Sequence, residues 1–389
     1  MPTLKVLGRH LDKTWRCYRP FVSPSFRTAY RELIAHQQPL PKVGKKVLFN
    51  LTSTRVDGPQ GRRFYNLHTF FRRAGYHPVF VNHFGFLANP KRNFKSHSFE
   101  HSFSLIEPGE PLPGDPKDWV IVTEQDQLPS AMANPVTPVF KLSLEVNEQV
   151  AGNEFAWPFP LFPGVYQRNQ DLELGPLQQQ PRHWQGFFGG QAAAHKYNTD
   201  WVRSVYGKVP RQRYLDICRQ TLLSKQAAVV APGSSEELNE LTHQNVSGAV
   251  FVYNEVCKIA VDQWLPTLAQ ARFFFACPGV RYPMSHNAIE ALAVGTVPII
   301  EYPEDFYPPL EDGVNCISFS GEAGLVSAIE RMLAMPEQQW QAISANAIDY
   351  YNRHLEPSAV VENLLQAYQA SNVDTIKLVP FLKCGGGHI

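Results

Sequence analysis

A loop and a helix start that carry the side chains of an anion-binding site follow one of the most apolar runs of this chain. Residues 272–276 (RFFFA) suit a strand buried on both faces, and residues 285–294 begin with polar side chains that can cap a helix. Helix N-terminal amides favour phosphate, as does the guanidinium of Arg281 in the intervening loop. We therefore expect an anionic ligand here. The candidate ligand-binding residues in this loop and helix start are Arg281, Tyr282, Ser285, His286 and Asn287.

The elements that must position this site are predicted from the surrounding pattern. Ile289 and Leu292 share one face of the expected helix, and Gly295 stands where a glycine would end it. Residues 296–300 form the next apolar run, which predicts a second buried strand. Ligands of open α/β sheets bind outside the carboxyl ends of the strands, so the loop and the helix start belong to the ligand-binding edge.

A short signature runs through this helix and the strand after it: Glu290, Ala291, Gly295, Val297 and Pro298. It resembles the donor-nucleotide half of GT-B glycosyltransferases, most of all the C-terminal signature of exostosin-like and fucosyltransferase-like enzymes. The resemblance is specific over roughly residues 185–320. It implies that Glu290 hydrogen-bonds ribose hydroxyls of a sugar nucleotide. From the residues alone, Glu290 would instead close a capping box on Asn287, three residues earlier.

A second candidate phosphate site lies earlier in the chain. Transfer from a nucleotide sugar leaves negative charge on the departing phosphate, which a positive group or a helix dipole must neutralise. Gly189 and Gly190 end an apolar run and would let backbone amides approach a phosphate closely. The related families place Arg or Lys after this strand, which implies Arg213 first and Arg211 next. The alternative is an exposed helix start with solvated charges.

The fold class follows from both the pattern and the resemblance. Apolar runs alternate with helical or long connecting segments, as in parallel Rossmann-like sheets, and 389 residues suit two domains. The resemblance implies an α/β protein of the GT-B class, with two Rossmann-like domains facing a cleft and a C-terminal helix crossing back. The predicted parts are a basic arm (1–45), an acceptor domain (46–165), a nucleotide-sugar domain (180–355), and a crossing helix with a tail (356–389).

The base that takes the acceptor's proton would come from loops of the first domain. Asp57 is the first choice for this catalytic residue, because it lies in the loop that follows a strand predicted at residues 46–52. Glu124, just past a strand predicted at residues 119–123, comes next together with Asp126, and His83 follows. The alternative for Asp57, which precedes Gly58, is a turn former.

Composition limits the class of protein. The net charge is only +1, but residues 1–46 contain ten basic and two acidic residues, so this arm carries +8 and the remainder −7. Such an arm could contact an anionic membrane or a phosphate-bearing glycolipid, or be a solvated extension. The sequence contains no run of 18 consecutive apolar residues, so no membrane-spanning helix is predicted. The six cysteines are scattered without CxxC pairs, which favours reduced thiols and a cytoplasmic protein.

The resemblance implies a glycosyltransferase that moves a sugar from a nucleotide-sugar donor to a glycan or glycolipid acceptor, in bacterial surface polysaccharide synthesis. The nucleotide sugar is a co-substrate, so no cofactor is expected, and the lack of a DxD motif gives no sign of a catalytic metal. GxGxxG, GxxxxGK[ST] and GxSxG motifs are absent, and nucleic-acid binding has little support. The alternatives are a non-catalytic sugar or nucleotide binder and a nucleotide-sugar epimerase of the same fold.

Overall fold

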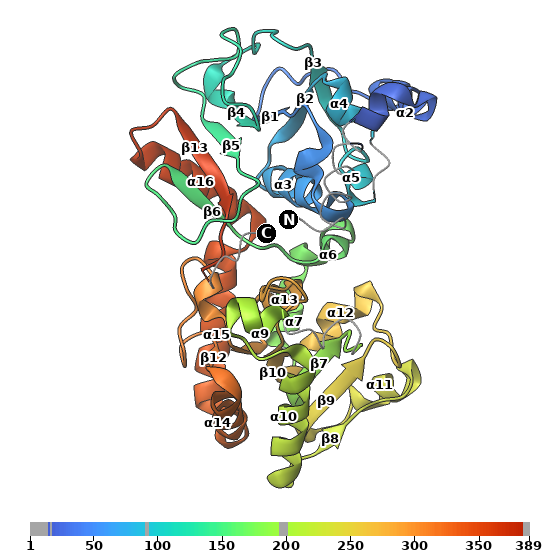
Figure 1. Cartoon of the computed structure of the whole chain (residues 1–389), viewed down its shortest axis with the longest axis vertical. Coiled ribbons are helices and arrows are strands. Elements are labelled where there is room, and N and C mark those ends of the chain that lie inside the picture. The colour runs from blue at the N-terminus through green and yellow to red at the C-terminus, as the bar shows by residue number, and fades with distance from the viewer. Residues whose placement is uncertain (1–14, 16–17, 90–92, 194–200, 384–389) are drawn as a thin grey trace, which may run out of the picture. The chain divides into compact units, whose positions relative to one another are not determined.

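The structure, a computed structural model, describes residue 15 and residues 18–89, 93–193 and 201–383. Most of the predicted arm is described, but residues 1–14 and 16–17 lie outside this part, as does the tail after residue 383. The chain forms two compact units (Figure 1). Unit 1 contains Met1–Glu145, Val150–Trp157 and Pro357–Pro380. Unit 2 contains Val146–Gln149, Pro158–Glu356 and Phe381–Ile389.

Unit 1 contains a parallel sheet in the order β3-β2-β1-β4-β5-β13-β6. The two central strands β1 and β4 are buried along their whole length, because their sequences KVLFN and WVIVT present apolar side chains to both faces. The strands are β1 (Lys46–Asn50), β2 (His77–Val81), β3 (Ser104–Ile106), β4 (Trp119–Thr123), β5 (Val139–Leu142), β6 (Glu154–Trp157) and β13 (Thr375–Pro380).

The C-terminal segment returns to unit 1. Helix α16 (Pro357–Ala370) packs on α3 (Arg62–Arg73), and β13 then enters the sheet between β5 and β6. The predicted crossing helix is therefore confirmed, whereas β6 and β13 were not predicted as strands. The other helices of this unit are α2 (Pro24–Ile34), α4 (Phe84–Leu87) and α5 (Phe94–His97), with short 3-10 turns η1 (Thr54–Asp57), η2 (Pro59–Gly61) and η3 (Pro116–Asp118).

Unit 2 contains a second parallel sheet in the order β12-β11-β10-β7-β9-β8. β7, β10 and β11 fall on apolar runs that the sequence predicts to be strands. The strands are β7 (Trp184–Gly190), β8 (Val229–Val230), β9 (Val246–Tyr253), β10 (Ala271–Ala276), β11 (Val297–Ile300) and β12 (Ile317–Ser318).

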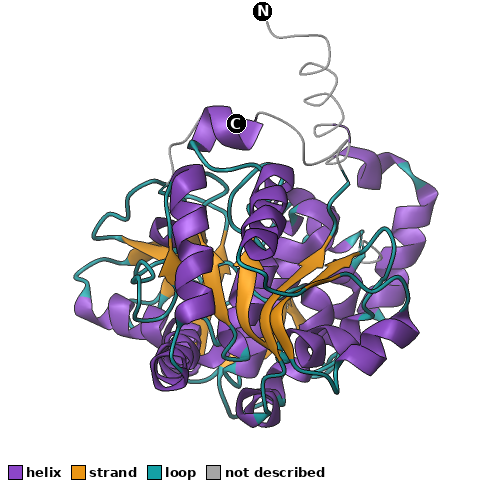
Figure 2. Cartoon of the chain, turned by 90° about the horizontal axis from the view of Figure 1, so that it is seen from below, coloured by secondary structure: helices purple, strands orange, loops and turns teal. Residues whose placement is uncertain are grey.

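Helices flank the strands of the protein (Figure 2). In unit 2, a buried cluster joins α10 and α14 to the sheet through residues such as Tyr214, Phe275 and Ile329. The helices are α6 (Pro163–Gln167), α7 (Leu174–Gln179), α9 (Trp201–Tyr206), α10 (Arg211–Ser224), α11 (Ser235–Leu241), α12 (Val261–Leu268), α13 (His286–Ala293), α14 (Gly321–Ala334) and α15 (Glu337–His354), with 3-10 turns η4 (Gln170–Leu172) and η5 (Pro303–Asp305). The expected α/β class with two Rossmann-like units is confirmed.

Two further expectations concern chemistry and environment. Cys218, Cys257, Cys277 and Cys316 are buried free thiols, as their apolar context predicts. Burial raises the pKa of Cys277 to about 12, so this thiol stays protonated at neutral pH. Within the described residues, no helix combines the length and the apolar character that crossing a bilayer requires.

Candidate functional site

The carboxyl ends of the unit 2 strands bring the predicted donor-site segments together. Because the strands are parallel, β7, β9 and β10 all end at the same edge of the sheet. There the Asn254 N–H donates to the Gly190 oxygen at 3.0 Å, and the Asn287 Nδ2 donates to the Gly189 oxygen at 3.2 Å. The glycine pair and the start of α13 are thus joined directly, as the sequence predicts for one ligand-binding edge.

The two glycines are required by geometry at the end of β7. Gly190 has a φ of 150°, a conformation that side chains rarely tolerate. A Cβ on Gly189 would lie 2.6 Å from the Trp264 ring, so the missing side chain makes room for this indole. The sequence predicts the glycine pair for its approach to phosphate, but it gives no sign of Trp264.

We expect Gly189→Ala to lower the free energy of unfolding by about 1–3 kcal/mol, because the Trp264 ring must move out of a well-packed position. Thermal unfolding and intrinsic tryptophan fluorescence measure the change. Gly175→Ala is the matched control, since nothing lies within 4 Å of a Cβ there. Equal unfolding temperatures for the two variants would contradict the packing seen around Gly189.

The predicted anion loop is a compact turn between β10 and α13. The Gly279 N–H donates to the Pro283 oxygen at 3.1 Å, and the Trp201 indole donates to the Arg281 oxygen at 3.2 Å. These bonds hold the backbone of the loop and leave the Arg281 side chain exposed. Tyr282 lies with its ring 6.4 Å from that of Tyr206. The loop therefore presents a guanidinium beside the start of α13.

Helix α13 begins as predicted, with Ser285 at its N-cap and His286 as its first residue. The Ser285 side chain accepts no capping hydrogen bond, so the first amides of the helix are not capped by it. The helix dipole adds partial positive charge at this end. Arg281 and α13 together make this loop the part of unit 2 best suited to a phosphate.

Glu290 occupies the centre of this edge and is 1% exposed. Its Oε1 accepts from the Phe162 N–H at 3.0 Å and its Oε2 accepts from Trp264 Nε1 at 2.5 Å. Burial raises the pKa of Glu290 to about 7, although these two donors act in the opposite direction. The capping-box interpretation is wrong, because the carboxylate bonds to Phe162 and Trp264 and Asn287 is not the N-cap. The ribose-binding role stays a prediction.

A segment that we call the strap, residues 158–163, covers the polar side chains of α13. Besides the Phe162 bond to Glu290, the Pro160 oxygen accepts from His286 Nδ1 at 2.8 Å. The rings of Phe159 and Phe162 lie 4.7 and 5.9 Å from the His286 ring. This Pro- and Phe-rich stretch gives no sign in the sequence of a contact with α13. In the structure it shares Glu290 and His286 with the candidate donor site.

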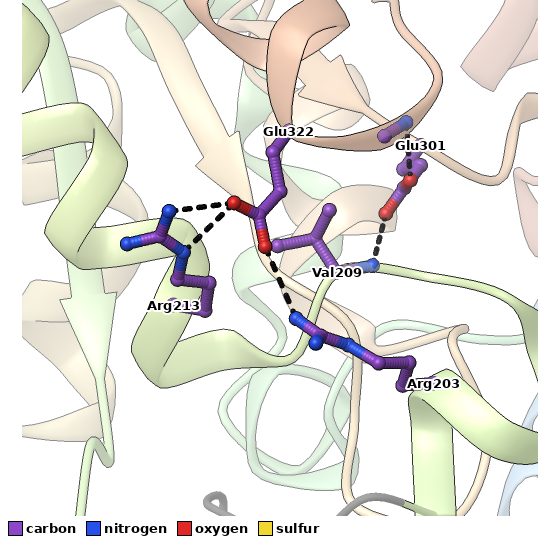
Figure 3. A network of polar contacts seen from close by, with 6 residues as sticks. Arg203, Val209, Arg213, Glu301 and Glu322 are labelled. Atoms are coloured by element: carbon purple, nitrogen blue, oxygen red, sulfur yellow. Dashed lines mark hydrogen bonds and ion pairs between the residues drawn. The ribbon is translucent and has the colours of Figure 1, made fainter.

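Arg211 and Arg213 both have protein partners. Arg211 is 9% exposed, and its guanidinium donates to the oxygens of Pro278 at 3.0 and 3.2 Å and of Gln191 at 2.8 Å. It therefore ties the anion loop to the end of β7. Arg213 donates two hydrogen bonds to Glu322 Oε2, at 2.6 and 2.9 Å (Figure 3). A phosphate would have to compete with these partners.

The surrounding carboxylates form a fixed polar network. Arg203 donates to the other oxygen of Glu322 at 3.1 Å, and these guanidinium groups hold the pKa of that carboxyl below its usual value (Figure 3). Glu301, at the end of β11, accepts from the backbone N–H groups of Val209 at 2.6 Å and Gly321 at 2.8 Å. This network joins the starts of α10 and α14 to the sheet, so Glu301 and Glu322 have structural roles that sequence reasoning missed.

In unit 1, Asp57 does not lie on an accessible loop. It ends the 3-10 turn η1 and is 0% exposed, with Oδ1 at 3.0 Å from Lys95 Nζ. Lys95 is equally buried, lies 3.6 Å from the centroid of the Phe86 ring and donates to the Phe86 oxygen at 2.7 Å. A substrate would have to displace this buried ion pair to reach Asp57, and loss of either partner would strand the other charge in the interior.

Glu124 and His83 lie at the carboxyl edge of the unit 1 sheet. Glu124 Oε1 accepts from the Thr52 N–H at 2.6 Å, from Thr52 Oγ1 at 2.8 Å and from the Ser53 N–H at 3.0 Å. Glu124 Oε1 is therefore already engaged by three donors from the loop that follows β1. His83 is half-buried and its Nε2 lies 3.1 Å from Asn50 Oδ1. Burial lowers the pKa of His83, while the Glu124 charge acts in the opposite direction.

Comparison with known proteins gives structural likeness at very low sequence identity. No family model and no curated protein matches the sequence. A glycosyltransferase from Rickettsia africae aligns at a TM-score of 0.42 with 9% identity, over 85% of this chain and all of that one. HepE from Anabaena, in complex with UDP and glucose, aligns at 0.38 with 11% identity, over 84% and 100%. The trehalose-6-phosphate phosphatase N-terminal domain of Candida albicans aligns at 0.39 with 10%, over 86% and 99%. These identities are too low to transfer the role of any residue.

Proposed function

We propose that this chain is a glycosyltransferase that moves a sugar from a nucleotide-sugar donor to a glycan or glycolipid acceptor. One observation carries the proposal: the carboxyl edge of the unit 2 sheet combines a buried carboxylate, Glu290, with the exposed guanidinium of Arg281 beside the start of α13. A carboxylate accepts bonds from sugar hydroxyls, and a guanidinium beside a helix N-terminus binds phosphate. A nucleotide sugar contains both sugar hydroxyls and phosphates.

In this proposal, the donor lies along the edge between the glycine pair and α13. Arg281 and the first amides of α13 neutralise the diphosphate in place of a metal ion, and the amides near Gly190 approach it from the other side. Glu290 accepts from the ribose hydroxyls once it exchanges its bonds to Phe162 and Trp264. Tyr282 stacks on the base. Because this neutralisation favours the leaving group, it lowers the barrier to breaking its bond to the sugar.

His83 is the base that this proposal favours in unit 1. If the Asn50 Oδ1 accepts from Nε2–H, the proton is fixed on Nε2 and Nδ1 keeps a lone pair. The lowered pKa keeps this imidazole neutral at pH 7, which is the form that takes up a proton. In a single displacement, the acceptor hydroxyl would transfer its proton to Nδ1 while its oxygen bonds to the anomeric carbon and the diphosphate leaves. Glu124 stabilises the imidazolium that forms.

The biological setting belongs to the same proposal. A basic arm at residues 1–46 suits an enzyme of surface polysaccharide or glycolipid synthesis that works in the cytoplasm and contacts the anionic inner face of a membrane. The rival function is a nucleotide or sugar binder without turnover. In either case the ligand must displace Phe162 and Trp264 to reach the Glu290 carboxylate.

A thermal-shift screen against UDP, GDP, CMP and dTDP and their sugars tests the proposal. A ligand at about 100 times its Kd stabilises by roughly 2.7 kcal/mol, which raises the unfolding temperature by several degrees. We expect one nucleotide to do so, and Arg281→Gln to weaken its binding by about 10- to 100-fold through the loss of a charge-assisted hydrogen bond.

Arg353→Gln on α15 is the matched control, because its guanidinium pairs with Asp349 on the same exposed helix. It removes the same charge and should keep the shift. No shift with any nucleotide would sink the donor-site proposal. A shift without sugar transfer to any acceptor would favour the binding protein, and donor conversion without an acceptor would favour an epimerase.

A further inference from the structure

In unit 1, helices α2 and α4 are in contact with each other (Figure 1). Side chains of these two helices, together with Phe21 just before α2, line a pocket of about 470 Å³. This volume is within the range of small-molecule sites. Its lining combines three aromatic rings with two cations: Phe21, Arg27, Tyr30, Arg31 and Phe84. Neither the nucleotide nor the proposed base uses any of these side chains.

The aromatic wall of the pocket is fixed in place. The Phe84 ring lies 5.4 Å from that of Phe21 and 5.1 Å from that of Tyr30, and the Tyr30 hydroxyl donates to Asn82 Oδ1 at 2.5 Å. Phe21 is nonetheless 51% exposed, and Tyr18 just before it is 62% exposed. Rings held rigidly but left open to solvent offer apolar contact area to a ligand at little entropic cost.

The charge of the pocket is uncompensated. Arg27 and Arg31 are one turn apart on α2 and both are exposed. Among the residues that the structure describes, neither guanidinium forms an ion pair. Like charges at this spacing repel each other and destabilise a helix slightly. An anion between them would remove that cost, and a guanidinium pair suits phosphate by geometry as well as by charge.

The pocket adjoins the candidate base. Phe84 follows His83 directly, and a Cβ on Gly85 would lie 2.5 Å from the Thr52 oxygen and 3.3 Å from the Phe21 ring. Thr52 in turn holds Glu124 at the carboxyl edge of the sheet. A molecule bound by its anionic group in the pocket would therefore extend along the edge where His83 lies.

We propose that this pocket binds the phosphate-bearing head and the adjoining apolar part of a single anionic amphiphile, which serves as the acceptor. The acceptor role rests on the proposed function; the binding does not. Three rings and two guanidinium groups line this one site, which suits one bound molecule with an apolar part and an anionic head. The two arginines grip the phosphate, and Phe21, Tyr30 and Phe84 contact the apolar part.

Isothermal titration of the whole chain with monomeric dodecyl phosphate tests this binding. The comparison ligands are inorganic phosphate, which lacks the chain, and dodecyl maltoside, which lacks the charge. We expect dodecyl phosphate to bind most tightly, and Arg27→Gln/Arg31→Gln to weaken it by on the order of 100-fold, since two charge-assisted contacts are lost. Lys42→Gln/Lys117→Gln is the control: it removes two exposed charges that precede β1 and β4, at the opposite edge of the sheet, and should leave binding unchanged.

Three results would overturn the proposal: equal affinity for dodecyl maltoside, equal loss in the lysine variant, or binding to vesicles of anionic lipid without binding to dodecyl phosphate monomers. The last would mean that the arm meets a membrane surface instead. Nucleotide binding is measured separately on the same arginine variant. Intact nucleotide binding with lost dodecyl phosphate binding supports both proposals, whereas dodecyl phosphate binding without nucleotide binding would leave the pocket standing and remove its acceptor role.

Discussion

Asp57→Asn is expected to lower the free energy of unfolding by about 3–5 kcal/mol, because it leaves the Lys95 ammonium buried without its counter-charge. Both side chains are fully buried, and Lys95 lies against the Phe86 ring, where water cannot replace the lost carboxylate. Urea unfolding followed by circular dichroism measures the change. The loss should appear in the transition of unit 1, since both residues belong to it.

Two controls separate charge burial from the loss of a bond. Asp57→Leu/Lys95→Met replaces both partners with apolar side chains and should recover most of the stability, because no charge is then stranded. Asp126→Asn breaks a pair with Lys141 in which the aspartate is exposed to solvent, and it should cost far less than Asp57→Asn. If Asp57→Asn is as stable as the unchanged protein but cannot transfer sugar, the prediction of Asp57 as the base regains its place and our structural role for it fails.

Asp57 also shows what sequence patterns could and could not predict. The neighbouring Gly58 marks a turn, and a turn is present, but the partner that decides the role of Asp57 is Lys95, in a region whose pattern predicts no element. Strands β10 and β11 were predictable because each is mainly a run of apolar residues, a purely local signal. Strand β13 was not, since its place between β5 and β6 depends on pairing with distant segments.

The candidate donor site also combines features that the sequence predicts with features that it does not. The positions of Gly190, Arg281 and Ser285 at one sheet edge follow from the order of strands, loop and helix, and the structure places them there. The engagement of Glu290 does not follow from that order. Phe162 precedes α6, and Trp264 lies on a helix with an internal proline, so neither offers a local signal of a hydrogen bond to a carboxylate.

Glu290 should make the protein less stable as the pH rises from about 4.5 to 7, and Glu290→Gln should remove that part of the slope. In the folded protein burial raises the pKa to about 7, whereas the unfolded chain has the ordinary value of 4.5. Below pH 4.5 Glu290 is protonated in both the folded and the unfolded protein, so its ionisation does not lower the free energy of unfolding. Between pH 4.5 and pH 7 only the unfolded chain releases the Glu290 proton. The free energy of unfolding therefore falls as the pH rises, by roughly 3 kcal/mol in all.

Urea unfolding at a series of pH values from 4 to 8.5, spanning both pKa values, measures this difference as the gap between the slopes of the unchanged protein and the glutamine variant. Glu240→Gln on α11, an exposed glutamate, should leave the slope as it is. Parallel curves for Glu290→Gln and the unchanged protein would mean that Glu290 ionises at its ordinary pKa and that water reaches it. The strap would then not seal this carboxylate, and a ribose could reach it without displacing Phe162. A gap of the expected size would instead make release of the strap a step in loading the donor.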